Sequence, residues 1–352
     1  MAGAIILNWT SGGHTPQLAF DGQGQLNLFF QASTSAGTHT INQVKMKADG
    51  TWTTPVVVSP EYQFFVSLTT ISDTSGRLCV LWSGEQYDQS GNALDGLARN
   101  CQQADGTWQA QALPLANTTG SVAIAAMRAP DGTLQSIFVS QSKPAGLYYT
   151  PLAGSATKPL KGTLLSGSLQ VLQGQIVIDT NGGYHVAWVE TSGGADITIQ
   201  HRFSLDSGKT WSPAEKLYSG SADNPADIHF QLLAGSAGQV HLAWDGDNAI
   251  HYRRWSAAGS WEAPITLSGT RRSSGVELVV GQDGLARAAW NMAASDSSIM
   301  LGRQLTDGTW RTPQAVSIGS ALEMVLAVEK TGAIEMLWNE GDGLRYLTVP
   351  GP

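Results

Sequence analysis

The sequence predicts an all-β fold, a seven-bladed β-propeller with four-stranded antiparallel blades. Two repeated phrases lead to this prediction. Asp-Gly-Thr-Trp occurs at residues 49–52, 105–108 and 307–310, and a short apolar strand ending in an aromatic residue recurs about every 46 to 56 residues. Short strands with turn signals between them indicate an all-β protein. Four such strands in each unit of about 50 residues are typical of propeller blades.

Seven units follow one another along the chain, each with the same order of elements. Their aromatic positions are Phe30, Trp82, Phe138, Trp188, Trp244, Trp290 and Trp338. In the fourth unit, an apolar strand at 175–178 precedes a Gly-rich turn and the strand that ends at Trp188. An alternating strand at 197–203, a turn at 204–211 and a last strand complete the unit.

The seventh unit has three strands, because residues 343–349 form its third and no fourth follows. The apolar segment 4–9 precedes the first full unit, so we expect it to be the outer strand of the last blade. This N-terminal strand would close the ring and cover two strand edges that otherwise invite aggregation. We therefore expect residues 1–352 to form a single propeller domain.

One turn carries a motif of a known family. Residues 204–211 read Ser-x-Asp-x-Gly-x-Thr-Trp, which resembles the Asp-box, or BNR repeat, of sialidase-like propellers. The resemblance extends in degenerate form over nearly the whole chain. It implies that Asp206 is structural and lies opposite the face used for activity. Sialidases also have an early Arg-Ile-Pro and an arginine triad; here the first arginine is Arg77, so sialidase activity is not expected.

Composition excludes several classes of protein. The net charge is −8, which argues against nucleic acid as a partner because phosphate binding needs clustered Lys and Arg. No apolar run reaches the length of about 18 residues that suggests a membrane span. No signal peptide is visible, although the Gly-, Ser-, Thr- and Trp-rich composition leans toward an exported protein, so the compartment stays open. We expect a monomer.

The two cysteines, Cys79 and Cys101, fall on neighbouring predicted strands of the second blade. Antiparallel register could place them opposite each other. A disulfide and two buried thiols are both compatible with that placement, and we expect the thiols.

Acidic residues gather in the loops between the second and third strands of the blades. They are Glu85, Asp88, Asp95, Glu190, Asp196, Asp245, Asp247, Asp296, Glu340 and Asp342. One interpretation is a face that binds cations, a basic partner or a sugar held by carboxylates. The other is that polar loops are simply solvated.

Two short motifs on this face suggest ligand binding. Asp245 and Asp247 lie in Asp-Gly-Asp-Asn, whose closely spaced oxygens suit Ca²⁺, the one cofactor that the sequence suggests; a tight turn explains the motif equally well. Arg271 and Arg272 enter the sixth blade and could grip a carboxylate, or they could be a surface pair.

Candidate acid–base residues enter the blades on the same face. Asp227 and His229 precede the fifth blade, and His14 precedes the first. Glu277 and Glu323 lie at or near the start of innermost strands and could line the mouth of the channel. An acid and a histidine that converge could transfer protons, whereas each alone is ordinary polar lining. The remaining histidines are expected to be structural: His185 and His241 at one repeat position, and His201 and His251 between blades.

The leading hypothesis is a non-catalytic recognition module that binds carbohydrate or a partner protein through its acidic loop face. A carbohydrate-active hydrolase or lyase with its site at the mouth of the axial channel is the first alternative. A scaffold propeller of a larger protein is the second. We expect a lectin to expose aromatic side chains such as Trp255 or Tyr148, and an enzyme to bring carboxylates together.

Overall fold

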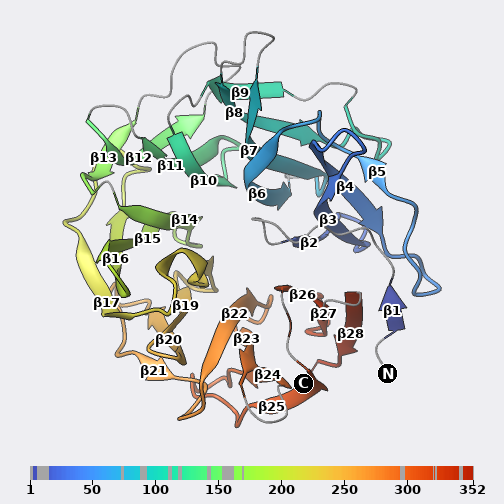
Figure 1. Cartoon of the computed structure of the whole chain (residues 1–352). Helices are drawn as coiled ribbons and strands as arrows, with labels where there is room; N and C mark the ends of the chain where they lie inside the picture. Colours follow the sequence, from blue (N-terminus) through green and yellow to red (C-terminus); the bar gives the residue numbers. More distant parts are fainter. Residues whose placement is uncertain are drawn as a thin grey trace. The chain divides into compact units, whose positions relative to one another are not determined.

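The computed structural model describes residues 3–5, 16–72, 75–87, 93–109, 113–117, 121–140, 144–152, 162–168, 170–293, 298–319, 321, 323–340 and 344–351. These residues form seven four-stranded antiparallel sheets, the blades of a seven-bladed β-propeller, so the predicted fold class is confirmed. Figure 1 labels their strands. Within the described ranges no helix is long and apolar enough to cross a membrane.

The chain divides into two compact parts, and residues 8–174 hold the first three blades. Blade one contains β2 (Gln17–Phe20), β3 (Leu26–Ser33), β4 (His39–Lys45) and β5 (Val56–Val57). Blade two contains β6 (Phe64–Ser72), β7 (Leu78–Tyr87), β8 (Ala93–Cys101) and β9 (Leu113–Asn117). Blade three contains β10 (Ser121–Arg128), β11 (Leu134–Ser140), β12 (Gly146–Leu152) and β13 (Thr163–Ser166).

The other part, residues 1–7 with 175–352, holds the remaining four blades apart from the first residues of β14. Blade four contains β14 (Val171–Ile178), β15 (Tyr184–Gly193), β16 (Asp196–Ser204) and β17 (Glu215–Ser221). A 3₁₀ turn, η1 (Pro225–Asp227), precedes blade five: β18 (Phe230–Ala234), β19 (Val240–Gly246), β20 (Ala249–Trp255) and β21 (Ile265–Thr266). Blade six contains β22 (Ser273–Val280), β23 (Ala286–Met292), β24 (Ser298–Arg303) and β25 (Gln314–Ile318). Blade seven contains β26 (Glu323–Val328), β27 (Ile334–Asn339), β28 (Leu344–Val349) and β1 (Gly3–Ile5).

The N-terminal strand closes the last blade, as the sequence predicts. β1 pairs antiparallel with β28, with Gly3 opposite Tyr346 and Ile5 opposite Leu344, and Figure 1 shows the two strands side by side. Residues 6–9 of the expected strand lie outside the described residues. The pairing gives blade seven its fourth strand and covers the edge of β28.

The repeated aromatic residue is the centre of each blade core. Trp82, Trp188, Trp244, Trp290 and Trp338 are at most 2% exposed. Trp290 belongs to a cluster that joins apolar residues of blades five and six. Truncation of such a buried Trp to Ala costs about 3–5 kcal/mol of stability. This contribution explains why a large aromatic residue recurs in each unit.

The Asp-Gly-Thr-Trp phrase, which has its fullest form at residues 204–211, forms a tight turn. Asp206 accepts hydrogen bonds from the Thr210 backbone N (2.8 Å), the Thr210 hydroxyl (2.7 Å) and the Ser204 hydroxyl (2.8 Å). These bonds lower the pKa of Asp206 to about 2. Gly208 has a φ of +82°, which favours glycine. The geometry gives Asp206 a structural role, while membership of the Asp-box family stays a prediction.

The tryptophan of this phrase packs on the preceding blade. Trp108 meets Phe29 of β3 edge to face, and its indole N–H donates to Gln43 (2.7 Å). Trp310 meets Tyr252 of β20 at a ring separation of 4.9 Å. The phrase therefore both ends a strand and joins adjacent blades.

The expectation of two free thiols is wrong. Cys79 of β7 and Cys101 of β8 are register partners with Cα atoms 4.0 Å apart, and their sulfurs are bonded. The sequence shows only that the strands are neighbours, and the choice of register decides which residues meet.

His185 and His201, both expected to be structural, are buried within blade four. His185 is 1% exposed and lies between Asp179 (3.2 Å) and His201 (3.1 Å), and His201 accepts the indole N–H of Trp261 in blade five (3.1 Å). Burial lowers the pKa of His185 and, further, of His201. Both residues are therefore neutral links between blades.

His241 and His251 also have internal partners. His241 is bonded to the Tyr252 hydroxyl (2.6 Å). His251 stacks on Trp244 at a ring separation of 5.3 Å and contacts Tyr218 of blade four. His251 therefore lies between blades, as expected.

Of the two aromatics that a lectin was expected to expose, Trp255 is only 6% exposed and packs on Trp261, so it provides no such binding surface. Tyr148 is half-buried and stacks on Phe138.

Candidate functional site

A cavity of about 230 Å³ opens at one end of blade five. Three segments surround it: residues 222–229 with η1, the end of β19 with the following turn, and residues 272–274 leading into β22. We call it the His229 pocket. Its lining is Ala222, Asp223, Asn224, Asp227, Ile228, His229, Asp245, Gly246, Asn248, Arg272, Ser273 and Ser274.

Asp245 ties the three segments together. One carboxylate oxygen accepts the His229 backbone N–H (2.8 Å), and the other accepts the Gly275 backbone N–H (2.8 Å). The Asp245 N–H in turn donates to the His229 carbonyl (3.0 Å). Because Asp245 is 8% exposed, this carboxylate is a fixed buried anchor on which both entering loops are built.

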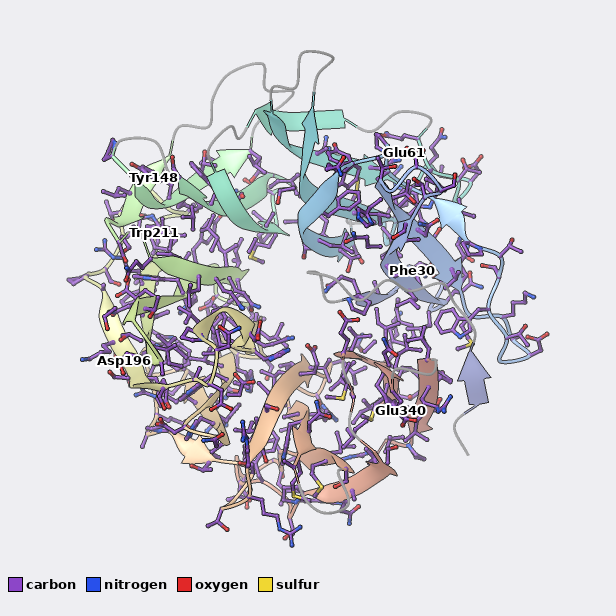
Figure 2. All side chains as sticks on the ribbon, viewed as in Figure 1. Phe30, Glu61, Tyr148, Asp196, Trp211 and Glu340 are labelled. Carbon is purple, nitrogen blue, oxygen red and sulfur yellow. A yellow bond between two sulfur atoms is a disulfide. The ribbon has the colours of Figure 1, made fainter. Side chains whose placement is uncertain are left out.

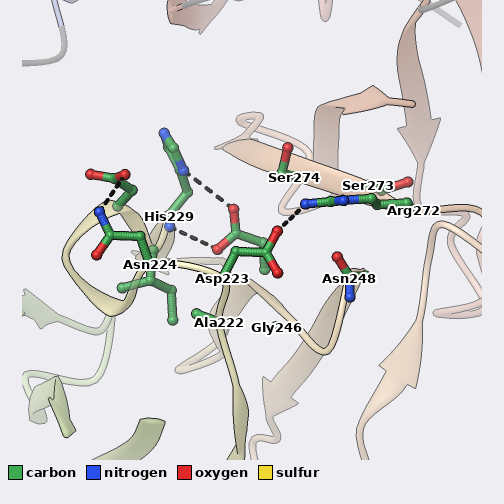
Figure 3. Close-up of a pocket in the computed structure, with 12 residues that line it drawn as sticks. Ala222, Asp223, Asn224, His229, Gly246, Asn248, Arg272, Ser273 and Ser274 are labelled. Carbon is green, nitrogen blue, oxygen red and sulfur yellow. Dashed lines mark hydrogen bonds and ion pairs between the residues drawn. The ribbon is translucent and has the colours of Figure 1, made fainter. Parts of the chain in front are cut away.

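His229 presents its ring to the pocket. Its Nδ1 lies 3.2 Å from Asp245, and in Figure 3 the other ring nitrogen points away from that contact. The side chain is 43% exposed. Partial burial lowers the pKa of His229, but the hydrogen bond to Asp245 and the charges of Asp245, Glu277 and Asp227 outweigh it, so the pKa is raised.

Two further pairs stand at the rim (Figure 3). The Asn224 amide donates to Asp227 (2.7 Å), and the Asp227 N–H donates to the Asn224 carbonyl (3.0 Å), which closes η1. The Arg272 guanidinium pairs with Asp223, and both side chains are about two-thirds exposed. An exposed ion pair contributes at most about 1 kcal/mol, so a ligand can replace it at little cost.

Glu277 lies behind the pocket in β22. It is 8% exposed and accepts the Gln231 amide (2.7 Å). Burial raises the pKa of Glu277 to about 8, although the charge of His229 and the hydrogen bond from Gln231 act in the opposite direction. The Glu277 carboxyl is therefore mostly protonated at neutral pH, and its charge raises the pKa of His229 only in the molecules where it is ionised.

The structure brings four of the predicted site residues to one cavity: Asp227, His229, Asp245 and Arg272. Arg271 is exposed next to Arg272 but does not line the pocket. Predicted groups from three separate segments therefore meet at one end of blade five.

The candidate Glu323 does not line this cavity, and some polar residues of the lining were not predicted. Glu323 starts β26, paired in register with Asn339, and is not in the lining of the pocket. His14 lies outside the described residues. Sequence reasoning missed Asp223 and Asn224, whose signal is a polar run just before a proline and the predicted His229.

The Asp-Gly-Asp-Asn motif is a two-residue hairpin turn. Asp247 and Asn248 have φ values of +50° and +61°, and the strands pair through Gly246 and Ala249. The Asp247 carboxylate turns away from the pocket to accept Tyr218 (2.6 Å) and Ser221 (2.8 Å). Asp245 and Asp247 thus serve different neighbours.

No group of three or more His, Cys, Asp or Glu in the described part of the chain could hold a metal ion. The predicted calcium site at Asp245 and Asp247 therefore stays a prediction, which ligand binding with and without EDTA can test.

Several acids of the predicted acidic face have internal partners. Glu190 and Glu340 each lie two residues after the repeated Trp and accept its indole N–H, at 3.3 Å from Trp188 and 2.8 Å from Trp338. Glu340, labelled in Figure 2, also binds Arg345 (3.2 Å). Asp88, Asp296 and Asp342 lie outside the described residues. Some of the acidic residues expected on the loop face therefore form hydrogen bonds within their own blades.

Comparison with known proteins identifies the fold and no family. No protein-family model and no curated protein matches the chain. Among solved structures, the BP39L lectin of Burkholderia pseudomallei is 14% identical, with a TM-score of 0.68, over 95% of this chain and 94% of that one. An ulvan lyase, a polysaccharide lyase, is 11% identical with a TM-score of 0.58, over 98% and 96%. The NanB sialidase of Streptococcus pneumoniae is 12% identical with a TM-score of 0.50, over 99% and 71%.

Proposed function

We propose that this protein is a recognition module that binds a carbohydrate in the His229 pocket. The observation that carries the proposal is the convergence of side-chain donors and acceptors on one cavity: the His229 ring, the Asn224–Asp227 pair and the Arg272–Asp223 pair. Each sugar hydroxyl donates and accepts hydrogen bonds, so alternating donors and acceptors match it. A lectin, a polysaccharide lyase and a sialidase with the same fold agree with a carbohydrate ligand.

The size of the cavity limits the ligand. Pockets for drug-sized molecules measure about 300–1,000 Å³, and this one is about 230 Å³. A single sugar residue at a glycan end, or one residue of a chain lying across the rim, suits this volume. Asp245 fixes the loops from below, and the exposed rim pair of Arg272 and Asp223 can exchange its mutual contact for sugar hydroxyls.

Turnover of the bound sugar is a second candidate, and one observation favours it. Asp245 orients His229 through Nδ1 while the ring remains 43% exposed to the pocket. A histidine held in this way can give or take a proton at Nε2. In that case His229 would be the acid–base residue and Asp245 its positioning residue.

A glycan array probed with the purified chain tests binding. We expect saturable binding to a small set of glycans, weakened about tenfold or more by Arg272→Ala and by His229→Ala. Arg271→Ala is the matched control, because Arg271 is the exposed neighbour that does not line the pocket. An array that stays silent would contradict the proposal and point to a protein partner.

Two further experiments test whether calcium supports binding and whether the bound glycan is cleaved. Binding measured with calcium and again with EDTA tests the predicted ion at Asp245 and Asp247, because an ion that supports the site makes binding EDTA-sensitive. Product analysis of the bound glycans tests turnover: reducing ends or unsaturated sugars that disappear with His229→Ala would make the protein an enzyme. Unchanged glycans would leave it a binding module.

A further inference from the structure

A second cavity of about 300 Å³ lies in blades six and seven, between the outer part of the sheet of β22–β25 and the end of β28. Arg303, Arg311, Thr312 and Gln314 contribute polar groups to its lining, and Leu301 and Val349 contribute apolar wall. No acidic residue belongs to the lining. This cavity shares no residue with the His229 pocket.

Three arginines form a row across blade six. Arg287 of β23 is the register partner of Arg303 of β24, and the Arg311 N–H donates to the Arg303 carbonyl (2.9 Å). Like charges directly opposite each other on a sheet are destabilising. Burial and the charges of Arg287 and Arg311 accordingly lower the pKa of Arg303.

The row is only partly neutralised by the protein. Arg287 is held by Asp283 through two hydrogen bonds of 2.6 and 2.7 Å. Within the described ranges, no ion pair joins a carboxylate to Arg303 or Arg311. The Arg303 guanidinium donates a hydrogen bond to the Pro350 carbonyl (2.7 Å). Arg303 and Arg311 thus both line the cavity without a carboxylate partner, in a protein whose net charge is −8.

In blade five, an acidic residue pairs with the arginine that is equivalent to Arg303. In blade five the Glu262 N–H donates to the Arg254 carbonyl (2.8 Å). This is the same backbone hydrogen bond that joins Arg311 to Arg303 in blade six. The side chains of Arg254 and Glu262 form an ion pair at 2.7 Å. In blade six the position equivalent to Glu262 is Arg311, so the partner that neutralises the first arginine is replaced by a second cation.

We propose that this cavity is a binding site for an oxyanion, a sulfate, phosphate or carboxylate group of a ligand. Guanidinium groups bind such groups with paired N–H donors, and the Thr312 hydroxyl and Gln314 amide add neutral donors. The anion takes the place that the Glu262 carboxylate occupies in blade five. The site is separate from the His229 pocket and does not depend on a carbohydrate ligand there.

The test is titration of the full chain with inorganic sulfate, inorganic phosphate and acetate by calorimetry, with chloride keeping the ionic strength constant. We expect saturable binding of at least one anion. Arg311→Glu recreates the ion pair of blade five and should weaken binding tenfold or more. Arg303→Gln, which removes the other guanidinium without adding a charge, should do the same. Lys209→Ala, at an exposed cation that lines neither cavity, should leave the affinity unchanged.

The choice among the anions identifies the source of the group. Acetate binding as tight as sulfate binding indicates a carboxylate ligand, whereas preference for sulfate or phosphate indicates an ester. Absence of saturable binding for all three anions would overturn the proposal. So would equal affinity in wild type and in both Arg311→Glu and Arg303→Gln, because binding would then occur elsewhere.

Discussion

The substitution Glu277→Gln should stabilise the protein, by an amount that depends on pH. The Glu277 carboxyl is buried, and its pKa is about 8 in the fold against 4.5 for an exposed glutamate. The unfolded chain therefore ionises above pH 4.5 while the folded chain does not, and stability is lost as pH rises toward 8. At 1.36 kcal/mol per pKa unit, the loss is about 3 kcal/mol at pH 7 and below about 1 kcal/mol at pH 5.

The Glu277→Gln substitution keeps the shape of the side chain and an acceptor for Gln231, and it removes the titration. Urea unfolding of both proteins at pH 5 and pH 7 measures the difference. The advantage of the variant over wild type in free energy of unfolding should be about 2–3 kcal/mol larger at pH 7 than at pH 5. Glu215→Gln, at an exposed carboxyl that begins β17, is the control and should show no such gain. A stability difference that is equal at both pH values would refute the reasoning.

Two further predictions concern buried groups outside the pocket. Burial lowers the pKa of His241 to about 4, so the unfolded chain takes up its proton first as pH falls below about 6.5. Wild type should therefore lose about 2 kcal/mol between pH 7 and pH 5 relative to His241→Gln, measured by urea unfolding; parallel curves for the two proteins would contradict this. Reduction of the Cys79–Cys101 disulfide, which spans 22 residues, should cost about 3 kcal/mol of loop-closure entropy, measured by unfolding with and without reductant. Two alkylatable thiols in the untreated protein would contradict the disulfide.

The fold could be predicted because the repeat is a physical unit. The buried aromatic position recurs in every blade and fills its core, and the Asp turn, in the blades that have it, ends the third strand. Even the closure of blade seven by β1 followed from a missing strand at one end and an apolar segment at the other.

The site could be predicted only in part, because side-chain direction is not a property of sequence position alone. His229 and Asp245 were found because they flank strands that enter and leave one end of the same blade. Glu190 and Glu340 resembled them in the sequence, yet each is turned to the indole of its own blade. Asp247 likewise turns to Tyr218, a partner 29 residues away that no local pattern indicates.

The central claim is that a glycan occupies the His229 pocket, and filling the pocket tests it most directly. Ser274 is exposed in the lining, so Ser274→Trp can occupy the cavity with little cost to the fold. Calorimetric titration with the glycan that gives the strongest array signal compares this variant with wild type and with Arg271→Trp outside the pocket. The account predicts that Ser274→Trp abolishes binding while Arg271→Trp retains it. Undiminished binding by a folded Ser274→Trp protein would contradict it.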